Sequence, residues 1–434
     1  MEVLALVLFA CIFILILFGF PVAFTLGGLS VLFGYFVLGI EFFNFLPSRI
    51  MGVMTNYVLI AVPLFIYMGI MLEKSGLAES MLETMALLFG KLKGGLAISV
   101  IVVGTLLAAS TGIVGATVIT MGLISLPTML KRNYSPELAT GTIASSGTLG
   151  QIIPPSVVLV LLGSVLNVSV GDLFAAALLP GMLLVSSYVA YVVIVAHVRP
   201  DQAPAISDEE IAAFRQTDYI KKVVMAFVLP LLLIVAVLGS IFAGIASPTE
   251  AAAVGALGAT FLTITQRKLN LSILKKVMYQ TTQLTSMVFI ILLGATTFAL
   301  VFRGMGGDSY LIGLIEESQL SPNLFLLLVM LVVFVAGFFI DFIEIIFIIV
   351  PVVAPIFVTY DMNLIWIGIL IAMNLQTSFL SPPFGFSLFY LKGVAPPEVT
   401  TVHLYRGIIP FVLIQLVFLV VVILVPEIVL WVVR

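Results

Sequence analysis

The segment Gln151-Ile152-Ile153-Pro154-Pro155-Ser156 decides the fold of this 434-residue chain, because its proline pair returns 228 residues later. The second segment reads Phe379-Leu380-Ser381-Pro382-Pro383-Phe384, and Pro127 returns as Pro355 with the same shift. Two adjacent prolines remove backbone hydrogen bonds and break a helix. Matching breaks at one fixed shift indicate that the chain consists of two related halves.

The composition places the chain in a membrane. Hydrophobic residues make up 62% of it and charged residues 9%, a balance that a soluble domain of this size cannot hide in its core. Apolar runs such as 3–20 and 223–241 are continuous rather than alternating, which favours helices over a β-barrel. The single cysteine, Cys11, excludes an intrachain disulfide and a multi-cysteine metal site. We therefore expect an all-α polytopic membrane protein, without a cleavable signal peptide.

The apolar segments fit about ten transmembrane helices and two re-entrant helical hairpins. The hairpins are 94–130 and 323–360, each too long for one crossing and interrupted by polar residues or proline. Each half then holds five crossings and one hairpin, and since five is odd the second half is an inverted repeat of the first. The predicted spans lie near 2–19, 21–40, 52–72, 138–165, 173–197, 223–243, 249–265, 279–302, 363–390 and 405–431.

The positive charges support this topology. With both termini outside, fifteen of the eighteen Lys and Arg residues fall in cytoplasmic segments, and only Arg49, Arg303 and Arg434 fall outside. This distribution follows the positive-inside rule. Treating 94–130 as a single span would reverse all later loops and remove the bias.

The broken segments of the first half carry candidate binding residues. A broken helix leaves free N–H groups at one end, which suit a carboxylate, and free C=O groups at the other, which together with hydroxyls suit Na⁺. A packing seam of small residues and a proline kink stabilised by neighbouring helices are the alternatives. The candidates are Ser110, Thr111, Gly112, Ser145, Ser146, Thr148 and Pro154.

The second half adds two carboxylates. Asp341 and Glu344 are three residues apart, so they share one helical face. An ionised carboxylate inside a membrane costs roughly 2.5–3.5 kcal/mol or more, so it should be paired, protonated or bound to a cation. An aqueous pocket or a subunit contact is the alternative. At the shift of 228 the counterpart of Asp341 is Ile113, and the other candidates of this half are Gln376, Thr377, Ser378 and Pro382.

The remaining polar features have structural interpretations. His197 and His403 sit at predicted span ends, Glu250 favours a helix start, and 303–308 is an outer loop rather than a phosphate loop. Segment 199–222 joins the halves as a solvated linker, with a short surface helix as an option. The sequence offers no nucleophile–base set or metal cluster for an enzyme. It offers no repeated filter for a channel either.

These features together resemble the large membrane subunit of tripartite ATP-independent periplasmic (TRAP) transporters over essentially the whole chain. The hairpins, the stretches 145–156 and 247–253, and Ser381-Pro382-Pro383-Phe384-Gly385 carry the resemblance. It implies a secondary transporter of the bacterial inner membrane that imports organic acids with a sodium gradient. The implied partners are a small four-helix membrane subunit and a periplasmic substrate-binding protein, and no nucleic acid. A stand-alone carboxylate carrier of similar fold, coupled to Na⁺ or H⁺, is the alternative.

The resemblance also implies an elevator movement. The repeats are 1–198 and 223–434, and in them 94–197 and 323–434 would slide as a transport domain against a scaffold of 1–93 and 223–302. Sodium ions would bind near Ser110, Ser145, Asp341 and Ser378, and no organic cofactor is implied. Glu344 has no role in the family pattern, which leaves proton coupling open.

Overall fold

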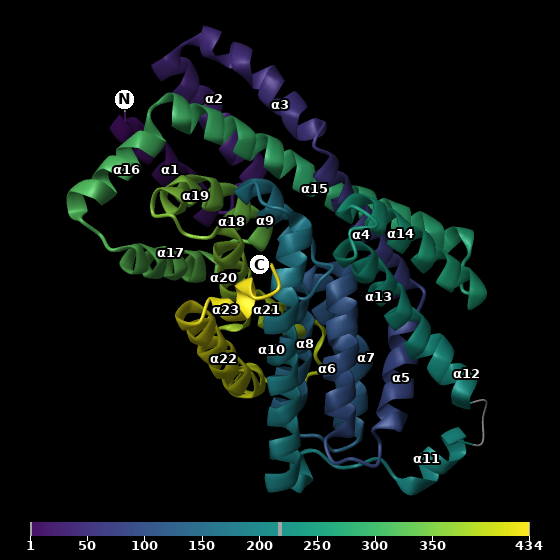
Figure 1. The fold of residues 1–434 in the computed structure, drawn as a ribbon. Helices are drawn as coiled ribbons and strands as arrows, with labels where there is room; N and C mark the ends of the chain where they lie inside the picture. The colour runs from purple at the N-terminus through teal and green to yellow at the C-terminus, as the bar shows by residue number, and fades with distance from the viewer. Residues whose placement is uncertain (1, 216–218, 434) are drawn as a thin grey trace.

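The computed structural model describes residues 2–215 and 219–433, and these residues form helices and short connections without a strand (Figure 1). Residues 216–218 of the predicted linker and Arg434, which was assigned to the outer side, lie outside the described residues.

The first half begins with two apolar helices and ends with a long one. Its elements are α1 (Glu2–Leu17), α2 (Val22–Leu38), the 3₁₀ turn η1 (Ile40–Phe45), α3 (Leu46–Met54), η2 (Tyr57–Ile60), α4 (Ala61–Lys74), α5 (Leu77–Leu88), α6 (Gly95–Thr111), α7 (Val114–Lys131), α8 (Pro136–Thr148), η3 (Leu149–Gln151), α9 (Val157–Leu166) and α10 (Val170–Val198).

The second half follows a short connecting region. That region contains η4 (Pro200–Gln202) and α11 (Asp208–Arg215). The elements after it are α12 (Tyr219–Val223), the π-helical turn η5 (Val224–Val228), α13 (Leu229–Phe242), α14 (Pro248–Thr265), α15 (Leu271–Gly304), α16 (Gly307–Ser318), α17 (Pro322–Ala336), α18 (Phe342–Ile348), α19 (Val350–Thr359), α20 (Leu364–Leu380), α21 (Phe386–Val394), α22 (Thr401–Leu424) and α23 (Glu427–Leu430).

The shift of 228 residues relates whole helices as well as prolines. The helices α1, α2, α5 and α6 correspond to α13, α14, α16 and α17, and α7 begins at Val114 while α18 begins at Phe342. The contacts between helices correspond as well. Helix α2 contacts α15, and α14, the counterpart of α2, contacts α4. Reciprocal contacts of this kind are what two repeats related by a twofold axis produce. The predicted repeat is therefore confirmed in helix order and in packing.

The number of uninterrupted spans is smaller than the predicted ten. Within the described residues six helices are long and apolar enough to cross a membrane, or seven if α18 and α19, which meet at a bend of 50°, count as one span. The difference arises because the predicted spans 138–165 and 363–390 are each broken at the proline pair, and because other apolar helices such as α1 and α2 have fewer than 18 residues.

Both predicted hairpins form helix–turn–helix units. In the first, α6 packs against α7 and the chain turns at Gly112, whose φ of +63° lies in the left-handed region that glycine tolerates. In the second, Phe325 of α17 packs edge-to-face against Phe357 of α19 with ring centroids 5.1 Å apart. The Tyr360 hydroxyl also donates to Leu320 O at 2.7 Å. The open ends of the second hairpin are therefore held together.

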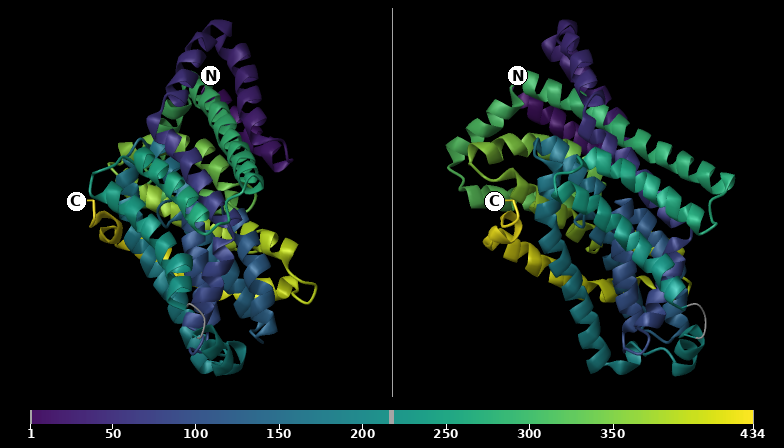
Figure 2. Two further views of the ribbon diagram at one scale, coloured as in Figure 1. Left: turned by 90° about the vertical axis from the view of Figure 1, so that its right-hand side faces the viewer. Right: turned by 45° about the vertical axis from the view of Figure 1, so that its right-hand side comes forward.

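The helices separate into two groups in the figures. The N-terminal helices α1–α3 and the long α15 lie together along one edge, whereas α6–α9 and α20–α22 occupy the other side (Figures 1 and 2). The broken spans lie inside the second group. The first break, Gln151–Ser156, is buried throughout, as unsatisfied backbone groups require. At the second break Ser381 is buried, whereas Pro383 and Phe384 are exposed.

The linker region is bound to the first half along part of its length. Ala203, Ile206 and Ile211 are buried, and Arg132 at the end of α7 pairs with Glu210 at 2.7 Å. Backbone hydrogen bonds run from Gly94 N to Ala203 O (2.9 Å), Ser135 N to Gln202 O (3.0 Å) and Ile206 N to Gly90 O (2.8 Å). We call residues 199–211 the strap, because they close over the ends of α5, α6, α7 and α8. Burial raises the pKa of nearby Tyr134 to about 12, so its phenol is neutral at physiological pH.

Several structural interpretations from the sequence are confirmed, and one changes. Glu250 completes a capping box with Ser247 at the start of α14, and His403 forms one with Thr400 at the start of α22. The segment 303–308 is more ordered than a loop. Arg303 ends α15, Asp308 begins α16, and the two pair at 3.1 Å.

Candidate functional site

The two broken spans and the two hairpin turns meet inside the chain. The turn η3 packs against α6 and α20, α18 packs against α9, and α21 packs against α7. We call this region, residues 108–117, 145–156, 337–344 and 374–390, the crossing. It contains every candidate residue predicted from the sequence.

Glycines set how closely the elements of the crossing approach. A Cβ on Gly150 would overlap the backbone oxygen of Ala108, and a Cβ on Gly337 would overlap the hydroxyl of Ser378. Gly150 and Ser378 are counterparts at the shift of 228. A close contact between a hairpin arm and a broken span therefore occurs in both halves, with the glycine on opposite partners.

The hydroxyls of the first half are oriented by their own helices. Each donates to a carbonyl three residues earlier: Ser110 to Leu107 O (2.8 Å), Ser145 to Thr142 O (3.1 Å), Ser146 to Ile143 O (3.0 Å) and Thr148 to Ser145 O (2.9 Å). All four are buried. Because the hydrogen is already donated, the lone pairs that remain on each oxygen are acceptors, which suit a cation.

The hydroxyls of the second half also donate to their own helix. Thr377 donates to Met373 O, four residues earlier, at 2.8 Å, and Ser378 donates to Leu375 O, three residues earlier, at 2.9 Å. The neighbouring Asn374 amide instead donates to Met330 O at 2.6 Å, which ties α20 to the hairpin arm α17. Oxygen acceptors therefore gather in both halves of the crossing.

Asp341 lies at the start of the second hairpin's inner helix. Its Oδ1 accepts from Phe342 N at 2.7 Å, and its own N–H donates to Glu344 Oε2 at 3.3 Å, which makes a capping box at the start of α18. Both side chains are part-buried. Ile113 holds the same position before α7 and has no side-chain cap. Capping explains why a short acidic side chain fits here, and a cation could still bind the free carboxylate oxygen.

Three residues of the crossing escaped the sequence interpretation. The Thr117 hydroxyl lies 2.8 Å from that of Thr111. The Tyr390 ring would lie 2.9 Å from a Cβ on Gly115. Gln151 is fully buried, and neither atom of its amide has a partner. Only tertiary contacts identify Thr117 and Tyr390. Gln151 was visible in the sequence, because it belongs to the segment 151–156 that contains the first proline pair.

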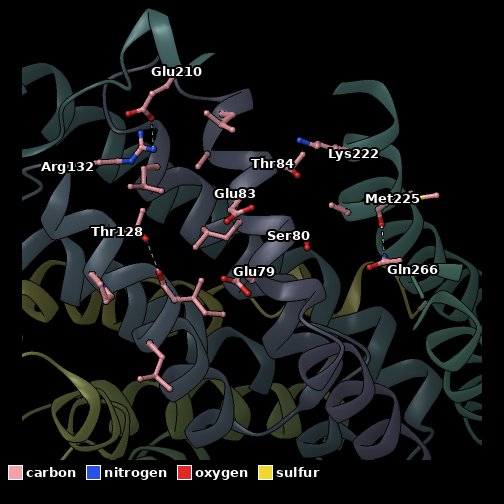
Figure 3. A pocket seen from close by; sticks show the side chains of 18 of the residues that line it. Glu79, Ser80, Glu83, Thr84, Thr128, Arg132, Glu210, Lys222, Met225 and Gln266 are labelled. Atoms are coloured by element: carbon pink, nitrogen blue, oxygen red, sulfur yellow. Dashed lines mark hydrogen bonds and ion pairs between the residues drawn. The ribbon is translucent and has the colours of Figure 1, made fainter. Parts of the chain in front are cut away.

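A separate cavity of about 1100 Å³ opens on the side of the strap (Figure 3). It is lined by α5 with Glu79 and Glu83, by the end of α7, and by the region around Met225. Its lining includes three carboxylates and four cationic side chains, so it has no strong preference for an anion. None of the predicted site residues lines it. The cavity is therefore distinct from the crossing.

Comparison with known proteins identifies the family. Residues 9–428 match the family model described as "Tripartite ATP-independent periplasmic transporter, DctM component". The chain belongs to the DctM family. Relatives include the C4-dicarboxylate TRAP transporter large permease protein of Pseudomonas aeruginosa, 33% identical over 86% of this chain and 85% of the relative. The ectoine TRAP transporter large permease protein of Halomonas elongata is 29% identical over 96% of each chain.

Solved structures support the fold of this DctM component. The YdaH transporter of Alcanivorax borkumensis superposes with a TM-score of 0.62 over 92% of this chain and 95% of that chain, at 13% sequence identity. At that identity the similarity concerns the fold alone.

Membership confirms the resemblance to TRAP large subunits and a membrane transport role. Large subunits of this kind in general work with a small membrane subunit and a periplasmic binding protein. The named substrates of the relatives include dicarboxylate, ectoine and, for a Vibrio cholerae relative 28% identical over 90% of each chain, sialic acid. Family membership therefore leaves the substrate open.

Proposed function

We propose that this DctM component is the translocating subunit of a sodium-coupled importer of organic acids. A periplasmic protein delivers the acid, and a separate small membrane subunit completes the complex in the inner membrane. The observation that carries the proposal is the pair of broken spans, where buried hydroxyls donate to their own helices and so keep oxygen lone pairs as acceptors.

The oxygens and Asp341 suit sodium. Na⁺ is a hard cation that prefers oxygen ligands, and the acceptor lone pairs of Ser110, Ser145 and Ser378 remain available. Asp341 adds one carboxylate, so that a bound cation is neutralised inside the membrane. Bound sodium in turn supplies positive charge for a substrate carboxylate, since no Lys or Arg is among the buried residues of the described chain.

We further propose that the crossing moves as part of an elevator. Gly69 of α4 lies against the backbone of Ser110 and Thr111, and Glu73 of α4 accepts from Thr120 of α7 at 3.0 Å. These contacts join the proposed scaffold to the proposed transport domain. Asn56 of the scaffold also donates to the Ser164 hydroxyl of α9 at 3.2 Å. Side-chain hydrogen bonds of this kind can be broken and remade by a sliding movement.

Reconstitution tests the proposal. The three proteins are studied in proteoliposomes with a radiolabelled C4-dicarboxylate, the substrate class named for the Pseudomonas aeruginosa relative. We expect uptake only with an inward sodium gradient and with the binding protein present. Uptake that persists when potassium replaces sodium would refute sodium coupling. Uptake without the binding protein would support the stand-alone carrier instead.

A further inference from the structure

Two side-chain amides in the crossing have no partner in the protein. Gln151 and Gln376 are both 0% exposed, and both the nitrogen and the oxygen of each amide lack a hydrogen bond. A buried polar group without a partner destabilises a protein, so such groups in a native chain need an explanation. The neighbouring Asn374 shows the ordinary outcome, since its amide nitrogen donates to Met330 O.

The two amides lie on elements that contact each other. Gln151 ends η3, three residues before Pro154 of the first proline pair, and η3 packs against α20, which carries Gln376. The repeat does not account for them. At the shift of 228 the counterpart of Gln151 is Phe379 and that of Gln376 is Thr148. At each of these two positions one half carries a glutamine, and the other half packs the equivalent position with a residue that has no amide. Helix packing at these positions therefore does not require an amide.

The chemistry of an amide differs from that of the hydroxyls around it. Each glutamine offers two N–H donors and one carbonyl acceptor, whereas the hydroxyls of Ser145 and Ser378 already donate to their own helices. No Lys or Arg is buried in the described part of the chain. The amide nitrogens of Gln151 and Gln376 are therefore side-chain donors suited to a carboxylate, and their oxygens need a donor from the ligand.

We infer that Gln151 and Gln376 bind the transported solute directly, and that this solute is an acid with a hydroxyl group beside its carboxylate. The N–H groups bind the carboxylate and the carbonyl oxygens accept from the hydroxyl. The inference rests on the proposed function, because it takes the crossing as the solute site. The inference adds a rule for substrate selection. An acid without the hydroxyl group should bind more weakly, because it leaves the buried side-chain oxygens of the two glutamines without a hydrogen-bond donor.

Ligand-induced stabilisation tests the inference on the purified complex of the large and small subunits. The probes are the sodium salts of two pairs of acids that differ in hydroxyl groups, malate with succinate and glycerate with propionate. We expect a hydroxy acid to raise the melting temperature of the wild-type complex more than its partner acid does. In Gln151→Leu and Gln376→Leu the acid concentration that gives the same shift should rise about tenfold.

Matched variants separate a binding role from a structural one. Without acid, both leucine variants should melt at or above the wild-type temperature, because leucine replaces an amide that has no partner. Gln415→Leu is the control, since the Gln415 amide is likewise buried without a hydrogen bond but lies outside the crossing, on α22. It should keep the wild-type response to acid. If Gln151→Leu does not fold, Gln151→Met, which keeps the side-chain length, takes its place.

Each outcome bears on a distinct statement. A loss of melting temperature in the acid-free leucine variants would show that the amides are bonded within the protein and would overturn the inference. Equal responses to both acids of each pair, no response to either hydroxy acid, or an unchanged response in the variants would also overturn it. The proposed function fails separately, if the wild-type complex in proteoliposomes shows no sodium-dependent uptake of any acid.

Discussion

Exchanging two residues in the second half should place its glycine on the broken span, where the first half has one. At the shift of 228, Ser378 on α20 corresponds to Gly150, and Gly337, the C-cap of α17, corresponds to Ala109. A Cβ introduced by Gly337→Ala would overlap the Ser378 hydroxyl and lie 2.8 Å from Ser378 Cβ, whereas ordinary contacts begin at 3.4 Å. The two helices must then separate by more than about half an ångström, and overpacking of this kind destabilises a protein by about 1–3 kcal/mol.

The double variant Gly337→Ala/Ser378→Gly removes the overlap. Ser378→Gly alone should destabilise the chain by about 0.5–1 kcal/mol, because glycine is unfavourable within a helix. We expect the double variant to be as stable as Ser378→Gly, which gives a coupling energy of about 1–3 kcal/mol. Thermal unfolding in detergent, followed by tryptophan fluorescence, measures the four proteins.

The same cycle separates packing from ion binding. Ser378→Gly removes an acceptor oxygen from the proposed sodium region, so the double variant should regain stability but not the wild-type sodium affinity in uptake assays. The reasoning would be refuted if Gly337→Ala were as stable as the wild type. It would also be refuted if adding Ser378→Gly failed to restore stability.

Three further changes test other contacts. Asp341→Asn should keep the fold, since asparagine also caps helices, while the sodium concentration for half-maximal uptake rises at least about tenfold; an unchanged sodium dependence would contradict the proposed role. Gly69→Ala should cost about 1–3 kcal/mol, because its Cβ meets the backbone of the first hairpin turn. In the matched Gly239→Ala, where nothing lies within 4 Å, stability should rise by about 0.5–1 kcal/mol; equal melting temperatures would contradict this. Glu210→Gln should cost at most about 1 kcal/mol, because its pair with Arg132 is partly exposed, and melting curves should show that the difference disappears at high salt.

The sequence predicts the elements whose signals are local. Continuous apolar runs indicate helices, and the proline pairs and the glycine-rich turn at Gly112 mark where spans break. The helices α5 and α16 were missed because they are short and carry charged residues such as Glu79 and Glu316, so neither resembles a span. The strap was missed for a related reason, since isolated apolar residues such as Ile206 and Ile211 give no periodic signal among polar neighbours.

The candidate site was predicted where the residue type is unusual for its surroundings. Asp341 and the hydroxyls stand out in an apolar sequence, and the structure places them together in the crossing. The approach of the Tyr390 ring to Gly115 depends on the contact between α21 and α7, which no local pattern encodes. Gln151 was visible in the sequence, but its lack of a partner appears only when the surrounding helices are in place.

The unequal caps of the two hairpins have a consequence for direction. A rotation that exchanges two inverted repeats also exchanges the two faces of the membrane. In a chain with identical repeats, the state with its site open to one face of the membrane would therefore have the same energy as the state open to the other face. Ion binding would then favour neither of the two states. Asp341 caps the start of α18, whereas Ile113 stands at the same position before α7 without a side-chain cap, so this chain lacks that equality where the proposed coupling ion binds. A cation bound at Asp341 therefore has a different energy in the two states, and that difference gives an elevator a preferred resting side.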